Sequence, residues 1–337
     1  MSQPSIQVIA IGNAIVDVMA PCADALIDQL GLVRGGMTLV DTDRAKELYD
    51  AMGPAREISG GSAANTLAGL AALGSRCAFI GQVADDQLGE VFAHDIRAGG
   101  ISFATASRAG DPPTARCLIF VTPDGQRTMN TFLGASQFLP SAALDEAAIA
   151  SAEVLYLEGY LWDPEEPRAA MRRAIAAARG AGRKVAFTLS DAFVIDRHGD
   201  DFRAMIAAGE IDILFANHVE LAALTGLDDF DAGLAALAPK VPLLVVTRSE
   251  HGAVTMSDGQ RTDVPAEPVA KVVDTTGAGD LFAAGFLHGH VSGRSVAECL
   301  TLGAICAAEV ISHYGARPEA NLKDLAAARL ESNSNPN

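Results

Sequence analysis

The sequence predicts an α/β protein with a mostly parallel central sheet between two layers of helices and a small β-sheet lid. Short strand-like segments alternate with helix-like segments through most of the 337 residues, which is typical of βαβ units. The strand-like segments are nearly continuous apolar runs, as in strands that are covered on both faces. Two stretches, residues 14–40 and 104–133, interrupt this alternation and are rich in β signals. We therefore expect a three-layer α/β/α core with one β-rich appendage.

The elements of the core follow from local patterns. The strands that we expect are Ile6–Ile11, Ala78–Gly81, Val154–Leu157, Val185–Leu189, Ile211–Phe215 and Leu243–Val246. The helices that we expect are Ser62–Leu73, Gln87–Ala98, Pro164–Ala181, Asp280–His290 and Ser295–His313. The first helix ends before Gly74 and the second before Gly99, and glycine is a common helix C-cap. Proline in the first turn marks the start of the third.

The two interrupting stretches predict the lid. Residues 14–40 contain Gly31, Gly35 and Gly36, and residues 104–133 lack helical periodicity. Thr122-Pro123-Asp124-Gly125 is a strong turn signal between two strand-like runs. Together the stretches could form a sheet that covers a cleft. We expect one domain over residues 1–331 and a polar, disordered tail at 332–337.

Composition excludes several classes of protein. Hydrophobic residues make up 49% of the chain and charged residues 20%, which predicts a sizeable core. No apolar run approaches the roughly 20 residues of a membrane span, and no secretory signal is visible, so we expect a cytoplasmic protein. The net charge of −17 without basic runs argues against nucleic-acid binding. Five scattered cysteines indicate reduced thiols, and the histidines lack zinc-ligand spacing.

The most informative motif is Asp274–Asp280, which reads DTTGAGD before an apolar helix. Small residues at a helix start leave backbone N–H groups available, and with the helix dipole these form an anion site. We expect the amides of Gly277, Ala278 and Gly279 to form it. Asp280 then lies in the first helical turn and can take a proton from a hydroxyl while the amides stabilise a transferring phosphoryl. The alternative is a glycine turn with a capping aspartate.

Two further motifs carry candidate substrate ligands. Gly60, Gly61 and Asn65 open the Ser62–Leu73 helix, where the glycines let a ligand approach the backbone and Asn65 offers a donor and an acceptor. Gly12-Asn13 leaves the first strand, and Asp17 follows, where it could accept hydrogen bonds from a diol. Taken alone, the first motif is also consistent with an ordinary helix start and the second with a surface turn.

The ends of two later strands indicate a nucleotide site, because ligands bind at the carboxyl ends of strands in such sheets. Asn217 and Glu220 lie one helical turn apart and could hold the water shell of Mg²⁺, or they form an N-cap and capping box. Thr247-Arg248-Ser249 follows the next strand and could contact phosphate or base. The P-loop sequence and the Gly-x-Gly-x-x-Gly turn are both missing, so a P-loop enzyme and a dinucleotide-dependent dehydrogenase are disfavoured.

These residues together resemble the ribokinase-like (PfkB-type) carbohydrate and nucleoside kinases from about Ile6 to Pro318. The resemblance rests on the glycine pair with Asn65, on Asn217-x-x-Glu220, and above all on Asp274–Asp280. It implies a ribokinase-like fold with Asp280 as general base and the Gly277–Gly279 amides as the anion hole. It also implies ATP as donor, Mg²⁺ held indirectly by Asn217 and Glu220, and a monovalent cation such as K⁺ near Asp274–Thr276 and Gly315.

Within the family the chain is most similar to the adenosine kinases. The similarity covers Gly12-Asn13-x-x-x-Asp17, Phe187–Ser190 with Phe193, residues 212–217, and the segment around Arg127 and Leu133. It implies transfer to the 5′-hydroxyl of adenosine, as in purine salvage. The implied substrate ligands are Asn13, Asp17, Gly60, Gly61, Asn65, Arg127, Leu133 and Leu161. The implied nucleotide ligands are Asn217, Thr247, Arg248, Thr276, Gly277 and Gly279.

The sequence departs from the family motifs in two respects, and two alternatives to an adenosine kinase function remain. Ser249 stands where the family's Thr-x-Gly motif has glycine, and Met129 and Leu161 differ from the usual purine-packing residues. The first alternative is a sugar kinase of the same family, acting on ribose, fructose or a related sugar. The second is a catalytically inactive, nucleoside-binding sensor. A lid sheet is compatible with either a monomer or a homodimer.

Overall fold

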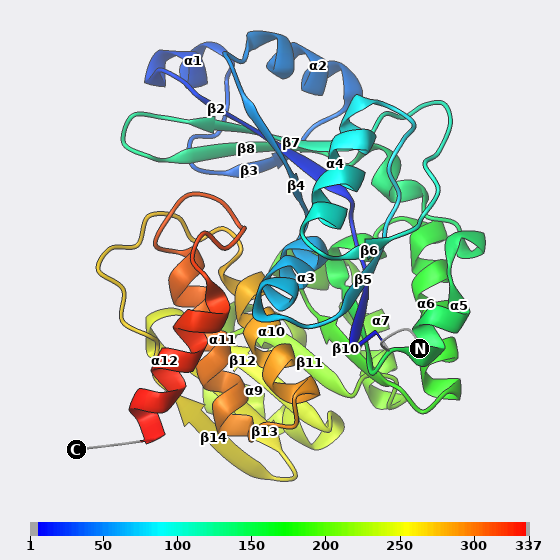
Figure 1. Ribbon diagram of the computed structural model, residues 1–337, viewed down its shortest axis with the longest axis vertical. Coiled ribbons are helices and arrows are strands. Elements are labelled where there is room, and N and C mark those ends of the chain that lie inside the picture. The colour runs from blue at the N-terminus through cyan, green and yellow to red at the C-terminus, as the bar shows by residue number, and fades with distance from the viewer. Residues whose placement is uncertain (1–5, 335–337) are drawn as a thin grey trace.

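The computed structural model describes residues 6–334, within which nine strands form one sheet in the order β14-β13-β12-β11-β10-β9-β1-β5-β6 (Figure 1). β12–β14 pair antiparallel at one edge and the other pairs are parallel. The fold class predicted from the sequence is confirmed. The strands are β1 (Val8–Ile11), β5 (Cys77–Ile80), β6 (Ser102–Phe103), β9 (Val154–Glu158), β10 (Lys184–Thr188), β11 (Ile213–Asn217), β12 (Leu243–Thr247), β13 (Ala253–Ser257) and β14 (Gln260–Val264).

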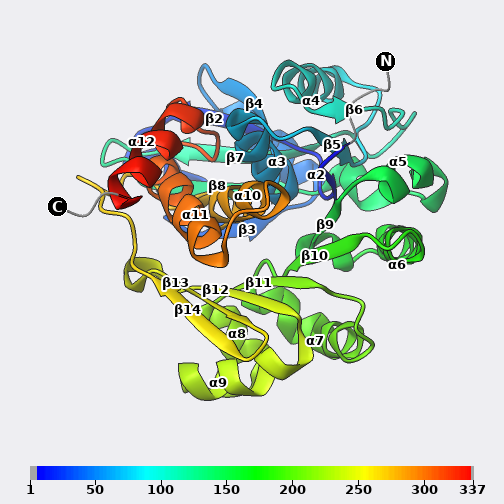
Figure 2. The same cartoon turned by 60° about the horizontal axis from the view of Figure 1, so that its bottom comes forward.

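Helices cover both faces of this sheet (Figure 2). Successive side chains of a strand point to opposite faces, so Val8 and Ala10 of β1 enter one hydrophobic core while Ile9 and Ile11 enter the other. The first face carries α3 (Ser62–Leu73), α4 (Gln87–Ala98), α10 (Ala278–Val291), α11 (Val296–Val310) and α12 (Leu322–Ser334). The second carries α5 (Glu146–Ser151), α6 (Glu165–Gly180), α7 (Ala192–Ala207), α8 (His218–Thr225) and α9 (Phe230–Leu237).

Local signals placed two helices at their observed bounds, α3 and α4. Other boundaries differ from expectation, among them that of α11, which ends at Val310 rather than at His313. Pro164 is the N-cap of α6 rather than a residue of its first turn, because its backbone is extended. Helix α10 begins at Ala278, two residues early, because Gly277 is already its cap. Residues 332–334, which we expected in a disordered tail, belong to α12, and residues 335–337 lie outside the described range.

A second sheet within the described residues has the order β3-β8-β7-β2-β4 and lies beside the carboxyl ends of the core strands (Figure 1). We call this sheet, with α1 and α2, the lid. It contains both predicted stretches, and residues 41–60 also belong to it, which the sequence analysis did not anticipate. Its elements are β2 (Ile15–Pro21), α1 (Asp24–Gln29), β3 (Met37–Leu39), α2 (Thr42–Ala51), β4 (Arg56–Gly60), β7 (Ala115–Val121) and β8 (Arg127–Phe132).

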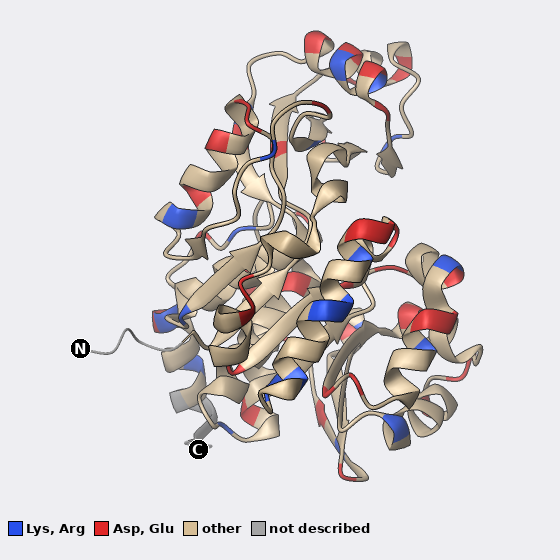
Figure 3. Ribbon diagram, turned by 90° about the vertical axis from the view of Figure 1, so that its right-hand side faces the viewer, with Lys and Arg blue, Asp and Glu red and all other residues tan. Residues whose placement is uncertain are grey.

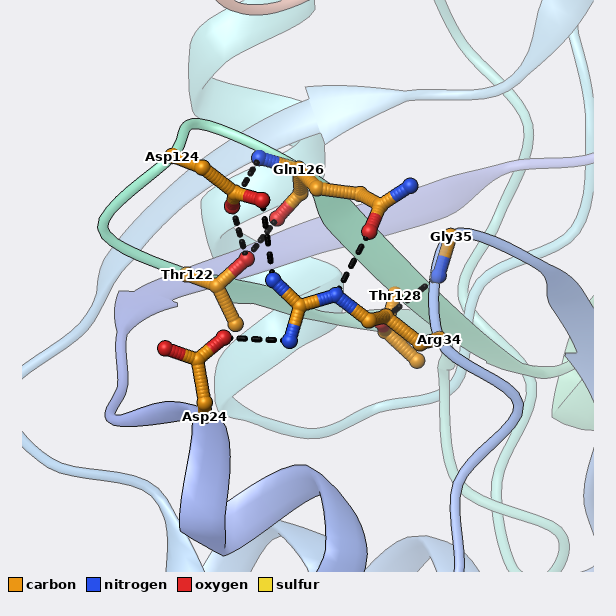
Figure 4. A network of polar contacts seen from close by, with 7 residues as sticks. All are labelled: Asp24, Arg34, Gly35, Thr122, Asp124, Gln126 and Thr128. Atoms are coloured by element: carbon orange, nitrogen blue, oxygen red, sulfur yellow. Dashed lines mark hydrogen bonds and ion pairs between the residues drawn. The ribbon is translucent and has the colours of Figure 1, made fainter.

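An arginine ties the two lid stretches together (Figure 4). The turn predicted at Thr122–Gly125 joins β7 and β8, with the Thr122 amide donating to the Gln126 carbonyl at 3.0 Å. Arg34 reaches this turn, and its guanidinium bonds the Asp124 carboxylate at 2.9 Å and the Gln126 side chain at 2.7 Å. It also pairs with Asp24 at the start of α1. These contacts are exposed, so they fix geometry more than they add stability.

The surface carries both signs of charge. On the side of the molecule shown in Figure 3, basic and acidic residues are interspersed along the helices. None of the helices in residues 6–334 has the length and apolar character needed to cross a membrane. All five cysteines are free thiols, as expected.

Candidate active site

The site begins where β1 and β9 end side by side. Ile11 is in register with Leu157, so the residues that follow each strand meet. Glu158, fully buried, accepts hydrogen bonds from the Asn13 amide at 2.7 Å and from the Asn13 side chain at 2.8 Å. Its second oxygen accepts the Ala63 amide at the start of α3, also at 2.7 Å. Burial raises the pKa of Glu158 to about 7, against the lowering effect of these bonds.

Asn13 was expected to face the nucleoside, and the structure places it differently. Its side-chain oxygen accepts the Ser136 hydroxyl at 2.8 Å while its nitrogen donates to Glu158. The residue is 3% exposed. Gly12 permits this arrangement, since a Cβ there would lie 2.6 Å from a Glu158 oxygen. In this structure Asn13 therefore braces the loop after β1.

Asp280 lies in the first turn of α10 and faces the first turn of α3. Its carboxylate accepts the Ser62 hydroxyl at 2.6 Å and the Asn65 side-chain amide at 3.0 Å. The helices pack closely at Gly69, where a Cβ would lie 2.6 Å from a methyl of Leu281. Burial raises the pKa of Asp280, and the two hydrogen bonds and the charge of Arg317 oppose that rise. The carboxylate is thus held in one orientation at a helix start that favours its ionised form.

The glycine loop before α10 differs in one respect from the predicted anion hole. Gly277 has φ 79°, and a Cβ there would lie 2.6 Å from Cβ of Ala316. The Ala278 amide is already used, because it donates to the Thr275 carbonyl at 3.2 Å. The amides of Gly277 and Gly279 have no partner within residues 6–334, and a Cβ on Gly279 would meet no atom within 4 Å. Two amides, rather than three, are free to bind an anion.

Asp17 lies on β2 against the glycine pair. A Cβ on Gly60 would lie 2.6 Å from an Asp17 carboxylate oxygen, and one on Gly61 would lie 2.2 Å from the Asn13 carbonyl. Gly61 also has φ 96°. Burial raises the pKa of Asp17 to about 6, and the charges of Arg317 and Arg127 oppose the rise. The structure therefore brings Asp17, Gly60, Gly61, Asn65 and Asp280 into one site, as the sequence predicted.

Arg127 joins the lid to the loop that precedes α10. Its guanidinium lies 2.8 Å from the Asp274 carboxylate and 5.5 Å from the centre of the Tyr314 ring. Asp274 also accepts the Thr276 amide and hydroxyl, at 3.0 and 2.7 Å, and the Gly315 amide at 3.0 Å. The groups expected beside a monovalent cation are therefore bonded to one another and to Arg127 in this structure.

The two leucines expected to contact the base lie in different environments. Leu133 lines a hollow of about 300 Å³ beside the lid, together with Leu39, Phe132 and Gln137. Leu161 is fully buried in the core on the opposite face of the central sheet from α3 and α10. Strand β9 and its following turn direct the Leu161 side chain into that core, and its contact with a ligand stays a prediction.

The predicted nucleotide residues lie at the ends of β11 and β12, where Asn217 is in register with Thr247. Asn217 and Glu220 form a complete capping box: the Glu220 carboxylate accepts the Asn217 side chain at 2.7 Å and its amide at 3.0 Å. Burial raises the pKa of Glu220 to about 7. Within residues 6–334, no cluster of three or more His, Cys, Asp or Glu side chains could hold a metal ion directly.

Ser249 shows how the chain accommodates its departure from the family motif. Its φ is 51°, in the left-handed region that glycine adopts without strain. The Arg248 amide donates to the Gly252 carbonyl at 2.7 Å, which closes the turn. The Arg248 side chain lies over the Phe230 ring at 4.4 Å. The backbone shape is therefore compatible with the glycine-containing motif although the residue is serine.

Comparison with known proteins agrees with this geometry. The model of the pfkB family of carbohydrate kinases matches residues 36–322. The chain belongs to the pfkB family. The family is one of phosphotransferases that use an alcohol group as acceptor, and this pfkB protein is one of them. Membership of a kinase family implies ATP as the phosphoryl donor, usually with Mg²⁺.

Three proteins to which this chain is similar are described as acting on different substrates. The adenosine kinase of Sinorhizobium meliloti is 49% identical with a TM-score of 0.89, covering 97% of this chain and 100% of that one. A probable sugar kinase of Rhizobium etli CFN 42 is 44% identical with a TM-score of 0.90, covering 97% and 99%. A fructokinase of Klebsiella pneumoniae is 29% identical, covering 82% of this chain and 93% of its own.

Sequence reasoning missed three residues of this pfkB site. Glu158 could have been found, because a carboxylate directly after the apolar run Val154–Leu157 must be paired when buried. Ser62 could have been found as a hydroxyl in the first turn beside Asn65. Arg317 carries no local signal, since its partners are Ser59 and Ala64, more than 250 residues away.

Proposed function

We propose that this protein transfers the γ-phosphoryl group of ATP to the 5′-hydroxyl of adenosine. The observation that carries the proposal is the Asp280 carboxylate, held at 2.6 Å by Ser62 and at 3.0 Å by Asn65, next to the unpaired amides of Gly277 and Gly279. A carboxylate takes the proton of the attacking hydroxyl, and the amides stabilise charge on the transferring phosphoryl. The start of helix α10 thus supplies both the base and the amides that stabilise the phosphoryl charge.

The other residues position the two substrates. Asp17 would accept hydrogen bonds from the ribose hydroxyls, because its carboxylate lies against Gly60 with no intervening side chain. Leu133, and Arg127 from the lid, would contact the nucleoside or the phosphates. Closure of the lid would exclude water, which otherwise competes with the hydroxyl as acceptor.

The nucleotide would extend toward the ends of β11 and β12. Thr247, Arg248 and Thr276 would contact it there. Mg²⁺, when bound, neutralises charge on the phosphates. Asn217 and Glu220 would hold its water shell, and Glu220 suits this because it is a carboxylate in the first turn of the helix that follows β11, paired with Asn217. A monovalent cation such as K⁺ would bind near Asp274 only if Arg127 gives way, since the carboxylate is otherwise neutralised.

A sugar kinase is the second candidate. Its support is the similarity, at 44% identity over 97% of the chain, to the protein described as a probable sugar kinase, together with the fructokinase similarity. Similarity to the adenosine kinase is slightly higher, at 49%.

ADP release across a panel of nucleosides and free sugars tests the proposal, with Asp280→Asn as the control. We expect adenosine to give the highest kcat/KM, and Asp280→Asn to lower kcat by about 10²–10⁴-fold, the usual contribution of a positioned base. Preference for ribose or fructose would select the sugar kinase. No ADP with any acceptor would select the sensor, and near-normal turnover in Asp280→Asn would remove Asp280 from the mechanism.

A further inference from the structure

Arg317, in the loop after α11, forms a four-bond clamp that the proposed mechanism does not use. Its Nε and Nη2 atoms donate to the Ser59 carbonyl at 2.9 and 2.7 Å, and Nη2 also donates to the Ser59 hydroxyl at 3.1 Å. Its Nη1 donates to the Ala64 carbonyl at 2.9 Å. The rigid, planar fork of a guanidinium can make these bonds at once, whereas an ammonium group cannot reproduce the geometry.

The clamp spans the segment on which the site is built. Ser59 is in strand β4 and Ala64 is in the first turn of α3. Gly60 and Gly61, against which Asp17 and Asn13 pack, lie between them, as does Ser62, which donates to Asp280. Two adjacent glycines are conformationally free in isolation. Arg317 restricts this segment by fixing the residues on either side of it.

Arg317 also supplies positive charge in an acidic site. Within the described residues it forms no ion pair, so its charge is not cancelled by a contacting carboxylate. Its charge lowers the pKa of both Asp17 and Asp280, against burial, which raises both. Burial lowers the pKa of Arg317 itself only to about 10, so it stays charged near neutral pH. Arg127 and Asp274 also act on Asp17, Asp95 acts on Arg317, and Asp280 in turn raises the pKa of Glu158.

We propose that Arg317 is a positioning residue for phosphoryl transfer, which holds the Gly60–Ser62 segment in place and brings a positive charge into the site of Asp17 and Asp280. The proposal rests on the proposed function in one respect, the role of Asp280 as base. Arg127 is the other arginine near Asp17, but its charge is already paired with Asp274. Arg317 is therefore the group whose charge acts on both carboxylates.

The test is the pH profile of kcat/KM for Arg317→Gln and Arg317→Lys. In Arg317→Gln the acidic limb should move to higher pH, and a shift of one pKa unit would lower kcat/KM on that limb by up to about tenfold. Arg317→Lys keeps the charge but loses the fork, so KM for the acceptor should rise while the acidic limb stays in place. Arg203→Gln is the control, because Arg203 also donates to a backbone carbonyl, that of Leu224, but on the other face of the sheet.

An acidic limb that does not move in Arg317→Gln, with only a lower melting temperature, would overturn the proposal. If Arg317→Gln does not fold, the Arg317→Lys variant provides the test. An unchanged KM for the acceptor, or an acidic limb that moves to another pH, would contradict the proposal. NMR titration of ¹³Cγ-aspartate enzyme, assigned with Asp17→Asn and Asp280→Asn, separates this proposal from the proposed function. It reads both carboxyl pKa values even if no acceptor is phosphorylated, and equal values in parent and Arg317→Gln would again reject it.

Discussion

Nη1 of Arg127 lies 2.8 Å from a carboxylate oxygen of Asp274, and this ion pair connects β8 of the lid to the loop before α10. Both side chains are buried, with 6% and 8% exposure. Asp274 also accepts the amide of Thr276 in this loop and the amide of Gly315 in the loop after α11. The position of the lid is therefore linked directly to the loop that carries Gly277 and Gly279.

We expect Arg127→Met to destabilise the protein by about 3–5 kcal/mol, because it leaves the buried Asp274 charge without its cation. The double variant Arg127→Met/Asp274→Asn should recover part of this loss, since no uncompensated charge remains. Urea unfolding measures both. Arg34→Met is the control: its partners Asp24 and Asp124 are more than half exposed, so its loss should be much smaller than that of Arg127→Met. Equal losses for Arg127→Met and Arg34→Met would contradict the assignment.

Asp17→Ala tests the diol contact. If the carboxylate accepts hydrogen bonds from ribose, adenosine should lose roughly 1.5–3 kcal/mol in kcat/KM, the scale of bonds to a charged group. The deficit should be much smaller for 2′,3′-dideoxyadenosine, which has no diol to lose. Steady-state kinetics with both substrates provides the comparison. A deficit of the same size for the two nucleosides would mean that Asp17 acts on folding or on the lid.

Glu220 has two possible roles, and the structure displays one of them, the capping box with Asn217. Glu220→Ala removes the cap and should cost about 0.5–2 kcal/mol of stability. Glu220→Gln keeps one acceptor oxygen for the Asn217 amide, so its melting temperature should stay near that of the parent. If Glu220 also orders water around Mg²⁺, Glu220→Gln should raise the Mg²⁺ concentration for half-maximal activity. If Glu220→Gln leaves the Mg²⁺ dependence unchanged and lowers the melting temperature strongly, Glu220 acts in the capping box and not on Mg²⁺.

Glu158 should make stability depend on pH. Its pKa is raised from 4.5 to about 7 by burial, so the folded state binds the proton more tightly than the unfolded chain. The stability contribution is therefore largest below pH 4.5 and is lost as the pH rises to about 7, a change of about 3 kcal/mol.

Glu158→Gln removes this titration, so its melting temperature should change less between pH 5 and pH 8 than that of the parent. Glu220 titrates in the same range and keeps part of the dependence in both proteins. Glu298→Gln is the matched control, because Glu298 is an exposed glutamate, bonded to the N-cap Ser295 of α11, whose pKa is lowered. Parallel curves for the parent and Glu158→Gln would show that Glu158 stays ionised throughout.

Features governed by neighbours in the chain could be predicted from the sequence. The ends of α3 and α4 followed from Gly74 and Gly99, which stand directly after them. Asp280 was placed in the first turn of α10 because Gly277 permits the positive φ of the cap. The capping box of Asn217 and Glu220 could be given as the alternative to a Mg²⁺ role because its hydrogen bonds join residues only three apart in the chain.

The tertiary structure alone decided which distant residues meet. Glu158 reaches Asn13 across 145 residues because β1 and β9 are neighbours in register. Arg127 meets Asp274 because the lid contacts the loop before α10, and Arg317 meets Ser59 because the lid also contacts the loop after α11. Caps and turns form through hydrogen bonds between residues that are only a few positions apart in the chain. Strand order and register fix these contacts, and they depend on how the whole chain packs.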